Sequence, residues 1–269
     1  MLFAATFFWG WTFPVVRDAV SEMPVFAFLT LRFILAGVFM LVLIRRFPPV
    51  SSWGFGGLLG IILFGAFAFQ TWGLVYTSSA NSGFITGLNV VWVFMLSPGC
   101  WRRAWPQALL AICGLWLLTS PDTESFNPGD WLTLVCSLFI AVHILMLSRM
   151  DKHRSSGDLA LVQFIVIAFA SATASLISEP YIVPPSFSGE LIFALLLTAG
   201  GATVFSFWVQ THFQRRTTAL RAGLIFICEP LFAAAFAVLF YGESIPPSAW
   251  PGAGLMLAAM IWTILREEK

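Results

Sequence analysis

The sequence predicts an all-α integral membrane protein, with ten transmembrane helices forming two inverted five-helix repeats around a central cavity. Three observations predict this class: the composition, the placement of the basic residues and an internal similarity. The composition comes first, because 59% of the 269 residues are hydrophobic and 10% are charged. Soluble domains are about 45–50% apolar and about 25% charged. The chain is therefore expected to pass through a bilayer many times.

A helix needs about 20 apolar residues to cross the hydrocarbon core of a membrane. The chain divides into ten such segments, at residues 2–20, 24–44, 55–75, 79–97, 104–120, 130–149, 158–178, 190–212, 219–241 and 246–265. Short connections rich in proline and glycine separate them, as expected of turns. No connection is long enough to hold a soluble domain.

The basic residues lie almost entirely on one side of the membrane in this arrangement. With the N-terminus in the cytoplasm, all but two of the 14 lysines and arginines lie in or beside the cytoplasmic connections. The exceptions are Arg17 and Arg32. Cytoplasmic loops of membrane proteins carry such an excess of basic residues. The sequence thus predicts a multi-pass protein of the cell membrane, a bacterial inner membrane being favoured, with both termini in the cytoplasm.

Two short similarities indicate an internal repeat. Residues 31–34 match residues 162–165 at an offset of 131, and residues 76–83 match residues 216–223 at an offset of 140. Each repeat then holds five helices, in residues 1–120 and 128–269. Because five is odd, the second repeat must lie inverted in the membrane, an arrangement typical of secondary transporters.

The ninth segment places Glu229 and Pro230 side by side in an apolar run. An acid costs free energy at this depth, and a proline removes a backbone hydrogen bond. Both are tolerated where the helix lines a cavity. Glu229 could bind substrate and exchange protons, or lock the structure with a backbone amide or with Arg221. Arg221 lies eight residues away, on the same face but too far for direct contact in a straight helix. The carbonyl that Pro230 frees could face the substrate.

Polar residues in other segments are further candidates. Asn89 falls on Glu229 at the 140 offset, which makes it a candidate for the substrate site, whereas Asn81 lies near two glycines that favour close helix packing. Arg32 could bind a substrate carboxylate, but a structural or gating role, with the side chain reaching the surface or pairing with an acid, is favoured. Gln163 is its neutral counterpart.

Histidine and tryptophan complete the candidates. His143 lies in the middle of its segment, where it either has a function or is a satisfied interior residue. Trp9, Trp92 and Trp208 lie deep in their segments. Such tryptophans either pack against lipid or line an aromatic cavity, which suits amphipathic substrates and cations.

The order of motifs along the whole chain resembles the ten-helix EamA-type permeases of the drug/metabolite transporter superfamily. The matching stretches are Trp9-Gly10 with Thr12-Phe13-Pro14, Leu31-Arg32-Phe33, residues 77–85, Arg215-Arg216-Thr217 with Arg221-Ala222, residues 229–233, and Gly242-Glu243. The resemblance implies a permease for small metabolites, most often an exporter of amino acids, with Thr12 beside Trp9 in its cavity. The first repeat departs from the family by having Ser97-Pro98-Gly99-Cys100 where an extended helix with a Gly-Glu ending is usual.

The sequence therefore predicts a secondary transporter that exports amino acids or similar small metabolites by alternating access. Alternatives are an efflux carrier for drugs or a carrier of nucleotide-sugar-like compounds, then a channel, then an intramembrane enzyme. No catalytic set, metal-ligand spacing or ATP-binding loop is present, so neither an enzyme nor a cofactor is expected. The net charge of +1 does not favour nucleic acid as a partner. The expected partners are the bilayer and a small-molecule substrate, and a monomer is compatible with this function.

Overall fold

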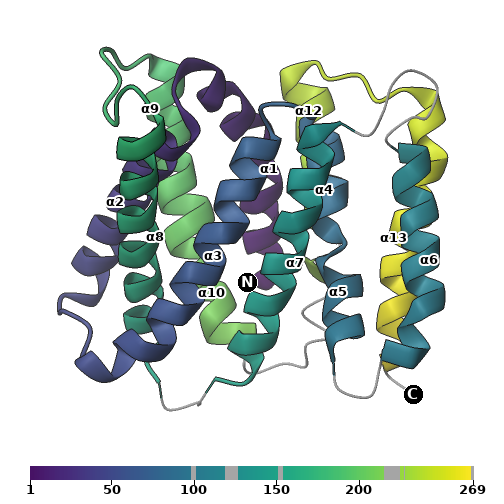
Figure 1. Ribbon diagram of the computed structural model, residues 1–269, viewed down its shortest axis with the longest axis horizontal. Helices are drawn as coiled ribbons and strands as arrows, with labels where there is room; N and C mark the ends of the chain where they lie inside the picture. Colours follow the sequence, from purple (N-terminus) through teal and green to yellow (C-terminus); the bar gives the residue numbers. More distant parts are fainter. Residues whose placement is uncertain (98–100, 119–126, 151–153, 215–224, 227, 268–269) are drawn as a thin grey trace.

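The computed structural model describes residues 1–97, 101–118, 127–150, 154–214, 225–226 and 228–267, and these ranges contain helices and no strand (Figure 1). The main helices are α1 (Leu2–Glu22), α2 (Val25–Ile44), α3 (Trp53–Gly73), α4 (Ser79–Gly87), α5 (Asn89–Leu96), α6 (Trp101–Leu118), α7 (Pro128–Ser148), α8 (Ser156–Ser178), α9 (Gly189–Leu196), the π-helix η2 (Leu197–Phe205), α10 (Ser206–Phe213), α12 (Cys228–Tyr241) and α13 (Trp250–Glu267). Short 3-10 turns, η1 (Val50–Ser52) and η4 (Pro247–Ala249), precede α3 and α13.

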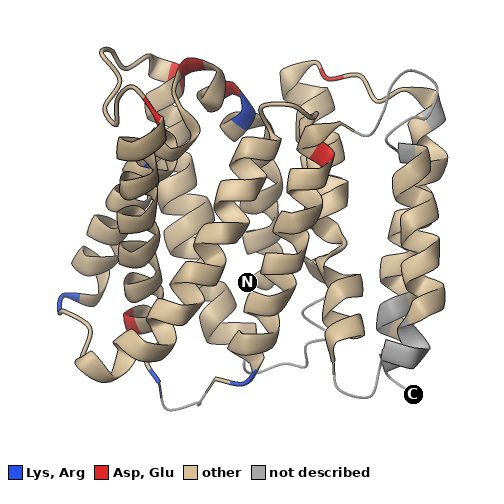
Figure 2. Cartoon of the chain, viewed as in Figure 1, with Lys and Arg blue, Asp and Glu red and all other residues tan. Residues whose placement is uncertain are grey.

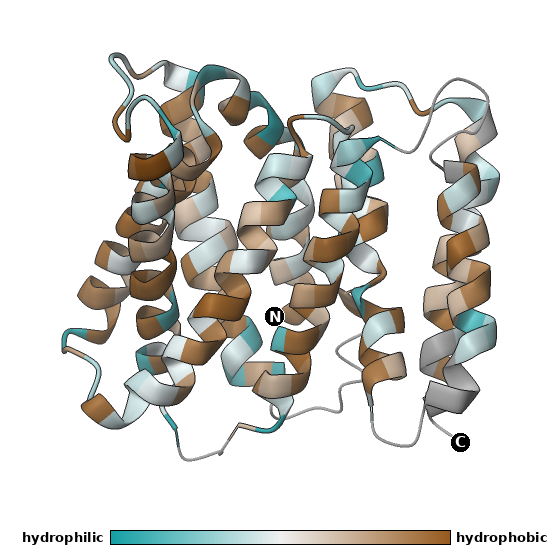
Figure 3. Cartoon of the chain, in the orientation of Figure 1, coloured by the Kyte–Doolittle hydropathy of each residue, from teal (hydrophilic) through white to brown (hydrophobic). Residues whose placement is uncertain are grey.

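Long apolar helices and an apolar exterior place the protein in a membrane, as predicted. Six helical stretches are long and apolar enough to span a bilayer: Val25–Ile44, Val50–Gly73, Ser79–Leu96, Pro128–Ser148, Ser156–Ser178 and Gly189–Phe213. Large apolar side chains cover the outward faces of these and the shorter helices, including Ile177 of α8 (81% exposed) and Leu239 of α12 (74% exposed). Such a surface is stable against lipid, whereas in water it would associate. Figure 3 shows hydrophobic colours along the helices and hydrophilic colours mainly at their ends.

The helices pack in a few dominant pairs. α2 lies against α8, α3 against both α7 and α8, α6 against α13, and α12 against both α1 and α4. Phe28, Phe33 and Phe164 are among the largest side chains buried completely between them. α1 also contacts α10 and η2, so it lies within the bundle. α1 is not among the six most apolar stretches because its charged residues Arg17, Asp18 and Glu22 follow one another in its exposed last turns.

Glycines let α12 approach its neighbours closely. A methyl group at Gly10 of α1 would come within 2.4 Å of Phe232 Cβ, and one at Gly83 of α4 within 2.5 Å of Ala233 Cβ. A methyl group at Gly87 would similarly meet Met260 and Pro230. Small residues at helix contacts are a common device in membrane proteins. They fix the position of the first turn of α12, which carries Glu229.

Charged residues concentrate at the two ends of the bundle. In Figure 2, blue basic positions gather mainly at one end and red acidic positions mainly at the other. Each end has one ion pair among the described residues, Arg46 with Asp158 at 2.7 Å and Arg17 with Glu243 at 2.5 Å. The acidic end therefore has one described arginine, Arg17, held by an acid. Which end faces the cytoplasm stays a prediction from the loop charges.

Two carboxylates cap helices at the acidic end. Glu179 accepts hydrogen bonds from the backbone amides of Phe26 and Ala27, at 2.7 and 2.8 Å, at the start of α2. Glu243 does the same for Ser79 and Ala80 of α4, at 3.1 and 3.3 Å. A negative charge is favourable at a helix N-terminus. Burial would raise the pKa of Glu243, but the hydrogen bonds from Ser79 and Ala80, with Arg17, lower it below its usual value.

Candidate substrate cavity

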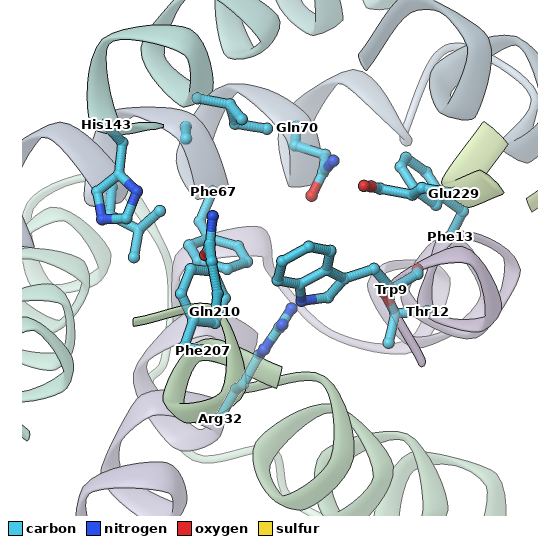
Figure 4. Close-up of a pocket in the computed structure, with 13 residues that line it drawn as sticks. Trp9, Thr12, Phe13, Arg32, Phe67, Gln70, His143, Phe207, Gln210 and Glu229 are labelled. Atoms are coloured by element: carbon cyan, nitrogen blue, oxygen red, sulfur yellow. The ribbon is translucent and has the colours of Figure 1, made fainter. Parts of the chain in front are cut away.

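A cavity of about 60 Å³ lies among α1, α2, α3, α7, α10 and α12 (Figure 4). Its lining is Trp9, Thr12, Phe13, Arg32, Leu63, Ala66, Phe67, Gln70, Ile140, His143, Phe207, Gln210 and Glu229. These side chains come from distant parts of the chain and meet in the interior of the bundle. Polar and ionisable groups are rare at this depth and mark transport pathways when they face a cavity.

The π-helix η2 positions two of the lining side chains. The indole Nε1 of Trp9 donates a hydrogen bond to the carbonyl oxygen of Ala202 at 2.9 Å, and Arg32 Nε donates to Thr203 Oγ1 at 3.0 Å. Gly201, next to both acceptors, leaves room for the ring of Phe8, which a methyl group would approach within 2.7 Å. π-Helical turns are rare and are frequent at functional sites. Here η2 brings a backbone carbonyl and a hydroxyl to the cavity wall.

Arg32 is buried within this wall. The residue is 3% exposed, and its guanidinium carbon lies 4.6 Å from the ring centre of Phe67 and 5.4 Å from that of Phe33. This placement corrects the expectation that Arg32 reaches the surface or pairs with an acid. Its bonded partner in the described part of the chain is the neutral Thr203. The aromatic faces contribute electrostatic attraction to the cation.

Glu229 enters the cavity from the first turn of α12. It is 9% exposed, and neither of the two described ion pairs includes it. In Figure 4 its carboxylate points toward the amide of Gln70. Gln70 in turn donates a long hydrogen bond of 3.4 Å to Thr86 Oγ1. The cavity thus contains one arginine and one glutamate side chain, held on different helices.

His143 reaches the cavity with its imidazole fixed by Gln163. His143 Nε2 lies 2.8 Å from Gln163 Oε1, and Gln163 Nε2 donates to the Leu159 carbonyl at 3.0 Å. Because the Gln163 amide group uses its nitrogen for Leu159, its oxygen accepts and His143 Nε2 carries the hydrogen. A neutral imidazole in this tautomer keeps Nδ1 as a hydrogen-bond acceptor. His143 is therefore both a satisfied interior residue and part of the cavity wall.

The family assignment rests on the sequence profile of the EamA-like transporter family. This profile matches residues 1–119 and again residues 127–265. The chain belongs to the EamA-like transporter family. The family resemblance expected from the motifs is confirmed. An uncharacterized transporter of Archaeoglobus fulgidus is 34% identical over 265 residues, covering 96% of this chain and 82% of the relative.

Other relatives of this EamA-like transporter are more distant. An S-adenosylmethionine uptake transporter of Rickettsia prowazekii is 25% identical, over 79% of this chain and 72% of the relative. A solved crystal structure matches with a TM-score of 0.71 at 18% identity, covering 100% of this chain and 97% of the other. At that identity the likeness concerns the fold. Family and relatives together make the chain a membrane transporter.

Four of the seven predicted substrate-binding residues of this EamA-like transporter meet in the cavity: Trp9, Thr12, His143 and Glu229. The other three lie elsewhere. Asn89, at the break between α4 and α5, donates to the Thr86 carbonyl at 2.9 Å, and its Oδ1 has no partner among the described residues. Trp208 stacks on His212, with ring centres 5.4 Å apart. Trp92 donates to Ser137 Oγ at 2.9 Å.

Trp92 also borders a second, apolar cavity of about 320 Å³. Its lining is Leu88, Val91, Trp92, Met95, Ala108, Ala111, Ile112, Leu115, Trp116, Trp131 and Leu134. Trp116 and Trp131 are 59% and 55% exposed, so this cavity lies beside the outer surface of the bundle. A wall without charges offers no binding groups for a polar metabolite, and the two cavities differ in kind.

The residues predicted to be structural or gating have mixed positions. Arg32 and the Gln163–His143 pair belong to the cavity wall, whereas Pro230 packs against Gly83 and Gly87 of α4. Asn81 lies in the first turn of α4, where its backbone amide donates to Ser78 Oγ at 3.1 Å. Arg221 lies outside the described residues.

Four further lining residues were not expected from the sequence: Phe67, Gln70, Phe207 and Gln210. A signal for them was present, because the same offset of 140 relates Phe67 to Phe207 and Gln70 to Gln210. The offset of 131 likewise relates Trp9 to Ile140 and Thr12 to His143. Each of these glutamines lies in an apolar segment, and they are separated by the same 140 residues that align Asn89 with Glu229. This recurrence would have identified both Gln70 and Gln210.

Proposed function

We propose that this protein is a secondary transporter that exports amino acids or similar small metabolites by alternating access. The observation that carries the proposal is the interior cavity, where Trp9, Arg32, His143 and Glu229 converge from four helices. In membrane proteins, such polar groups lie on a substrate pathway. Trp9, Thr12, His143 and Glu229 contact the substrate in this proposal, whereas Trp92 and Trp208 support the surrounding helices.

The helix contacts support a pseudo-twofold arrangement of two inverted repeats, residues 1–120 and 128–269. In that arrangement α1 corresponds to α7, α2 to α8, and α3 to the α9–η2–α10 segment. α3 packs against α7 and α8, and, as the symmetry requires, η2 packs against α1 and α2. The two family matches, at residues 1–119 and 127–265, divide the chain in the same place. Substrate sites of inverted-repeat transporters lie between the repeats.

The size of the cavity supports a mechanism with moving helices. Pockets for small molecules usually have volumes of about 300–1,000 Å³, far more than the 60 Å³ present here. At the acidic end, Thr77 Oγ1 donates to Asp130 at 2.5 Å and Arg17 pairs with Glu243 at 2.5 Å. Because Glu243 also accepts from the backbone amides of Ser79 and Ala80, these bonds hold α1, α4 and α7 together at that end. Loading a metabolite then requires the repeats to move apart, which alternating access provides.

Counterflow in proteoliposomes tests the proposal. Purified protein is reconstituted, the vesicles are loaded with one unlabelled compound at a time, and uptake of the same labelled compound is measured. The panel contains amino acids, nucleosides and sugars. Saturable counterflow of an amino acid is expected, and vesicles sorted by orientation give the direction. Large single-channel conductance would overturn the carrier mechanism, whereas counterflow of nucleosides or sugars alone would leave a carrier of another substrate class.

The gradient that drives export is proposed to be protons, acting through Glu229 or His143. In the described part of the chain, the other ionisable groups near Glu229 are Arg32 in the cavity, Cys136 on α7 and the adjacent Cys228 of α12. The test compares counterflow and pH-driven uptake between pH 6 and pH 8 for Glu229→Gln and for His143→Gln. Loss of pH-driven uptake, with counterflow retained at saturating substrate, is expected for the coupling residue. If Glu229→Gln transports with the pH dependence of the original protein, Glu229 has no coupling role.

A further inference from the structure

We propose that Arg32 and Glu229 bind opposite charges of one substrate, so that the cavity selects zwitterions and the bound molecule bridges the two halves of the protein. Arg32 holds the anionic group and Glu229 the cationic group. This inference rests on the proposed transport function and deepens it, because it assigns to Arg32 the part of a substrate-binding residue. The chemical class of the ligand is a small molecule with a carboxylate and an ammonium or similar cation.

Arg32 has N–H donors that remain free to bind a ligand. A guanidinium carries five N–H donors in a planar fork. The Nε donor binds Thr203 Oγ1 at 3.0 Å, and no acid pairs with Arg32 among the described residues. Phe67 covers one face of the group at 4.6 Å. The terminal donors are therefore left at the cavity, where a carboxylate can accept two parallel hydrogen bonds.

Glu229 enters the cavity from a different helix than Arg32. Its carboxylate belongs to α12, whereas Arg32 belongs to α2, and Figure 4 shows the two side chains entering the cavity from different sides with Trp9 between them. The two charges thus face a common space without forming an ion pair among the residues described. A ligand that carries both charges fits this arrangement, and the Trp9 ring offers an apolar wall to its side chain.

The burial of both groups makes a ligand with two charges energetically favourable. A buried charge without a partner costs free energy, and this cost is recovered when a partner of opposite charge binds with good hydrogen bonds. Arg32 is 3% exposed and Glu229 9% exposed. An amine satisfies Glu229 but leaves Arg32 unpaired, and an anion does the reverse. A zwitterion satisfies both groups at once, which gives the site its selectivity.

The positions that correspond to Arg32 and Glu229 in the opposite halves carry neutral residues. The offset of 131 places neutral Gln163 where Arg32 stands, and the offset of 140 places neutral Asn89 where Glu229 stands. Each half of the protein therefore contributes one charge to the cavity.

The experiment first measures binding to the purified protein in detergent, using thermal stabilisation by each of the twenty standard L-amino acids. The amino acid that stabilises most is then compared with its decarboxylated amine and with its deaminated acid, which keep the same side chain. At least tenfold weaker binding is expected for both analogues. Absence of stabilisation by any amino acid, or equal binding of an analogue, would overturn the zwitterion site.

Variants assign each charge to its residue. Arg32→Gln copies the residue of the other half and is expected to bind the zwitterion at least tenfold more weakly while binding the amine unchanged. Glu229→Gln is expected to weaken the zwitterion similarly and to leave the deaminated acid unchanged. Arg46→Gln removes an arginine outside the cavity and serves as the control. If Arg32→Gln does not fold, Thr203→Val, which removes the Nε acceptor and keeps the charge, is expected to weaken the zwitterion and the deaminated acid together.

The outcome is distinguishable from failure of the transport function. Counterflow of a sugar or nucleoside that Arg32→Gln leaves unchanged would overturn the zwitterion site and retain the transporter. Stabilisation by an amino acid with the expected charge dependence, but without counterflow, would retain the binding site and overturn the transporter.

Discussion

Replacing Gly10 with alanine tests whether the close approach of α1 and α12 positions the cavity. Gly10 is one residue after Trp9, and its Cα faces the α12 turn that carries Glu229. An added methyl group would lie 2.4 Å from Phe232 Cβ and 2.9 Å from the backbone nitrogen of Ala233 and the carbonyl oxygen of Glu229. Two of these three neighbours are backbone atoms, so rotating a side chain cannot relieve the overlap.

The expected effect is the balance of two terms. The methyl group must move at least 0.6 Å to reach a separation of 3.0 Å from Phe232 Cβ, below which such contacts essentially never occur. Forcing a methyl group into a well-packed site costs about 1–3 kcal/mol. Alanine gains about 1 kcal/mol over glycine within a helix. The net expectation is a loss of about 0–2 kcal/mol of stability, together with displacement of Glu229 relative to Trp9.

The matched control is Gly37→Ala on α2, where an added methyl group has no neighbour within 4 Å. This variant should be neutral or more stable by up to about 1 kcal/mol, because only the helix term applies. Thermal unfolding in detergent measures the stability of both variants, and proteoliposome counterflow measures their transport. If Gly10→Ala matches Gly37→Ala in both assays, the α1–α12 contact does not constrain the cavity and the reasoning fails.

Three further predictions concern hydrogen bonds of single side chains. Glu243→Gln weakens the cap of α4 and should lower stability at neutral pH by about 0.5–2 kcal/mol. The folded pKa of Glu243 is lowered from 4.5, so the stabilisation by its carboxylate is complete above pH 4.5 and is lost as the pH falls through the folded pKa. The melting temperature of the Glu243→Gln variant should therefore fall less on acidification than that of the original protein. Gln163→Leu leaves His143 Nε2–H without its acceptor and should cost about 1–3 kcal/mol in thermal unfolding; an unchanged melting temperature would contradict the pairing. Trp9→Phe keeps an aromatic ring but loses the bond to the Ala202 carbonyl, so we expect about 1 kcal/mol less stability and a raised KM in counterflow.

Much of the helical architecture could be predicted because apolar segment length is a strong signal. The segment predicted at 79–97 appears as α4 and α5, with a break before Asn89, and the segment at 190–212 contains the π-helix η2. Neither irregularity could be predicted from hydropathy, since both depend on hydrogen bonds within the helix and on the packing around it. The inverted repeat remains a prediction supported by the contacts of α3 and η2.

The candidate site was predictable where a residue type was costly. Glu229 and His143 stood out because an ionisable group in an apolar segment needs a reason. Asn89, Trp92 and Trp208 were chosen for their depth in apolar segments but lie outside the cavity lining, because depth along a helix does not determine which face the side chain occupies. The favoured structural role for Arg32 placed its side chain at the surface or against an acid, but its observed position depends on Thr203, a contact 171 residues away along the chain.

The small volume of the cavity has a mechanical consequence. Enlarging a space of about 60 Å³ to the roughly 300 Å³ of a small-molecule site adds about 240 Å³ to the interior of the bundle. If the proposed alternating-access cycle creates this space by separating the repeats within the membrane plane, the expansion does work against the lateral pressure of the bilayer. Turnover in proteoliposomes is then expected to be slower in lipids with tightly packed acyl chains and faster in lipids with loosely packed ones.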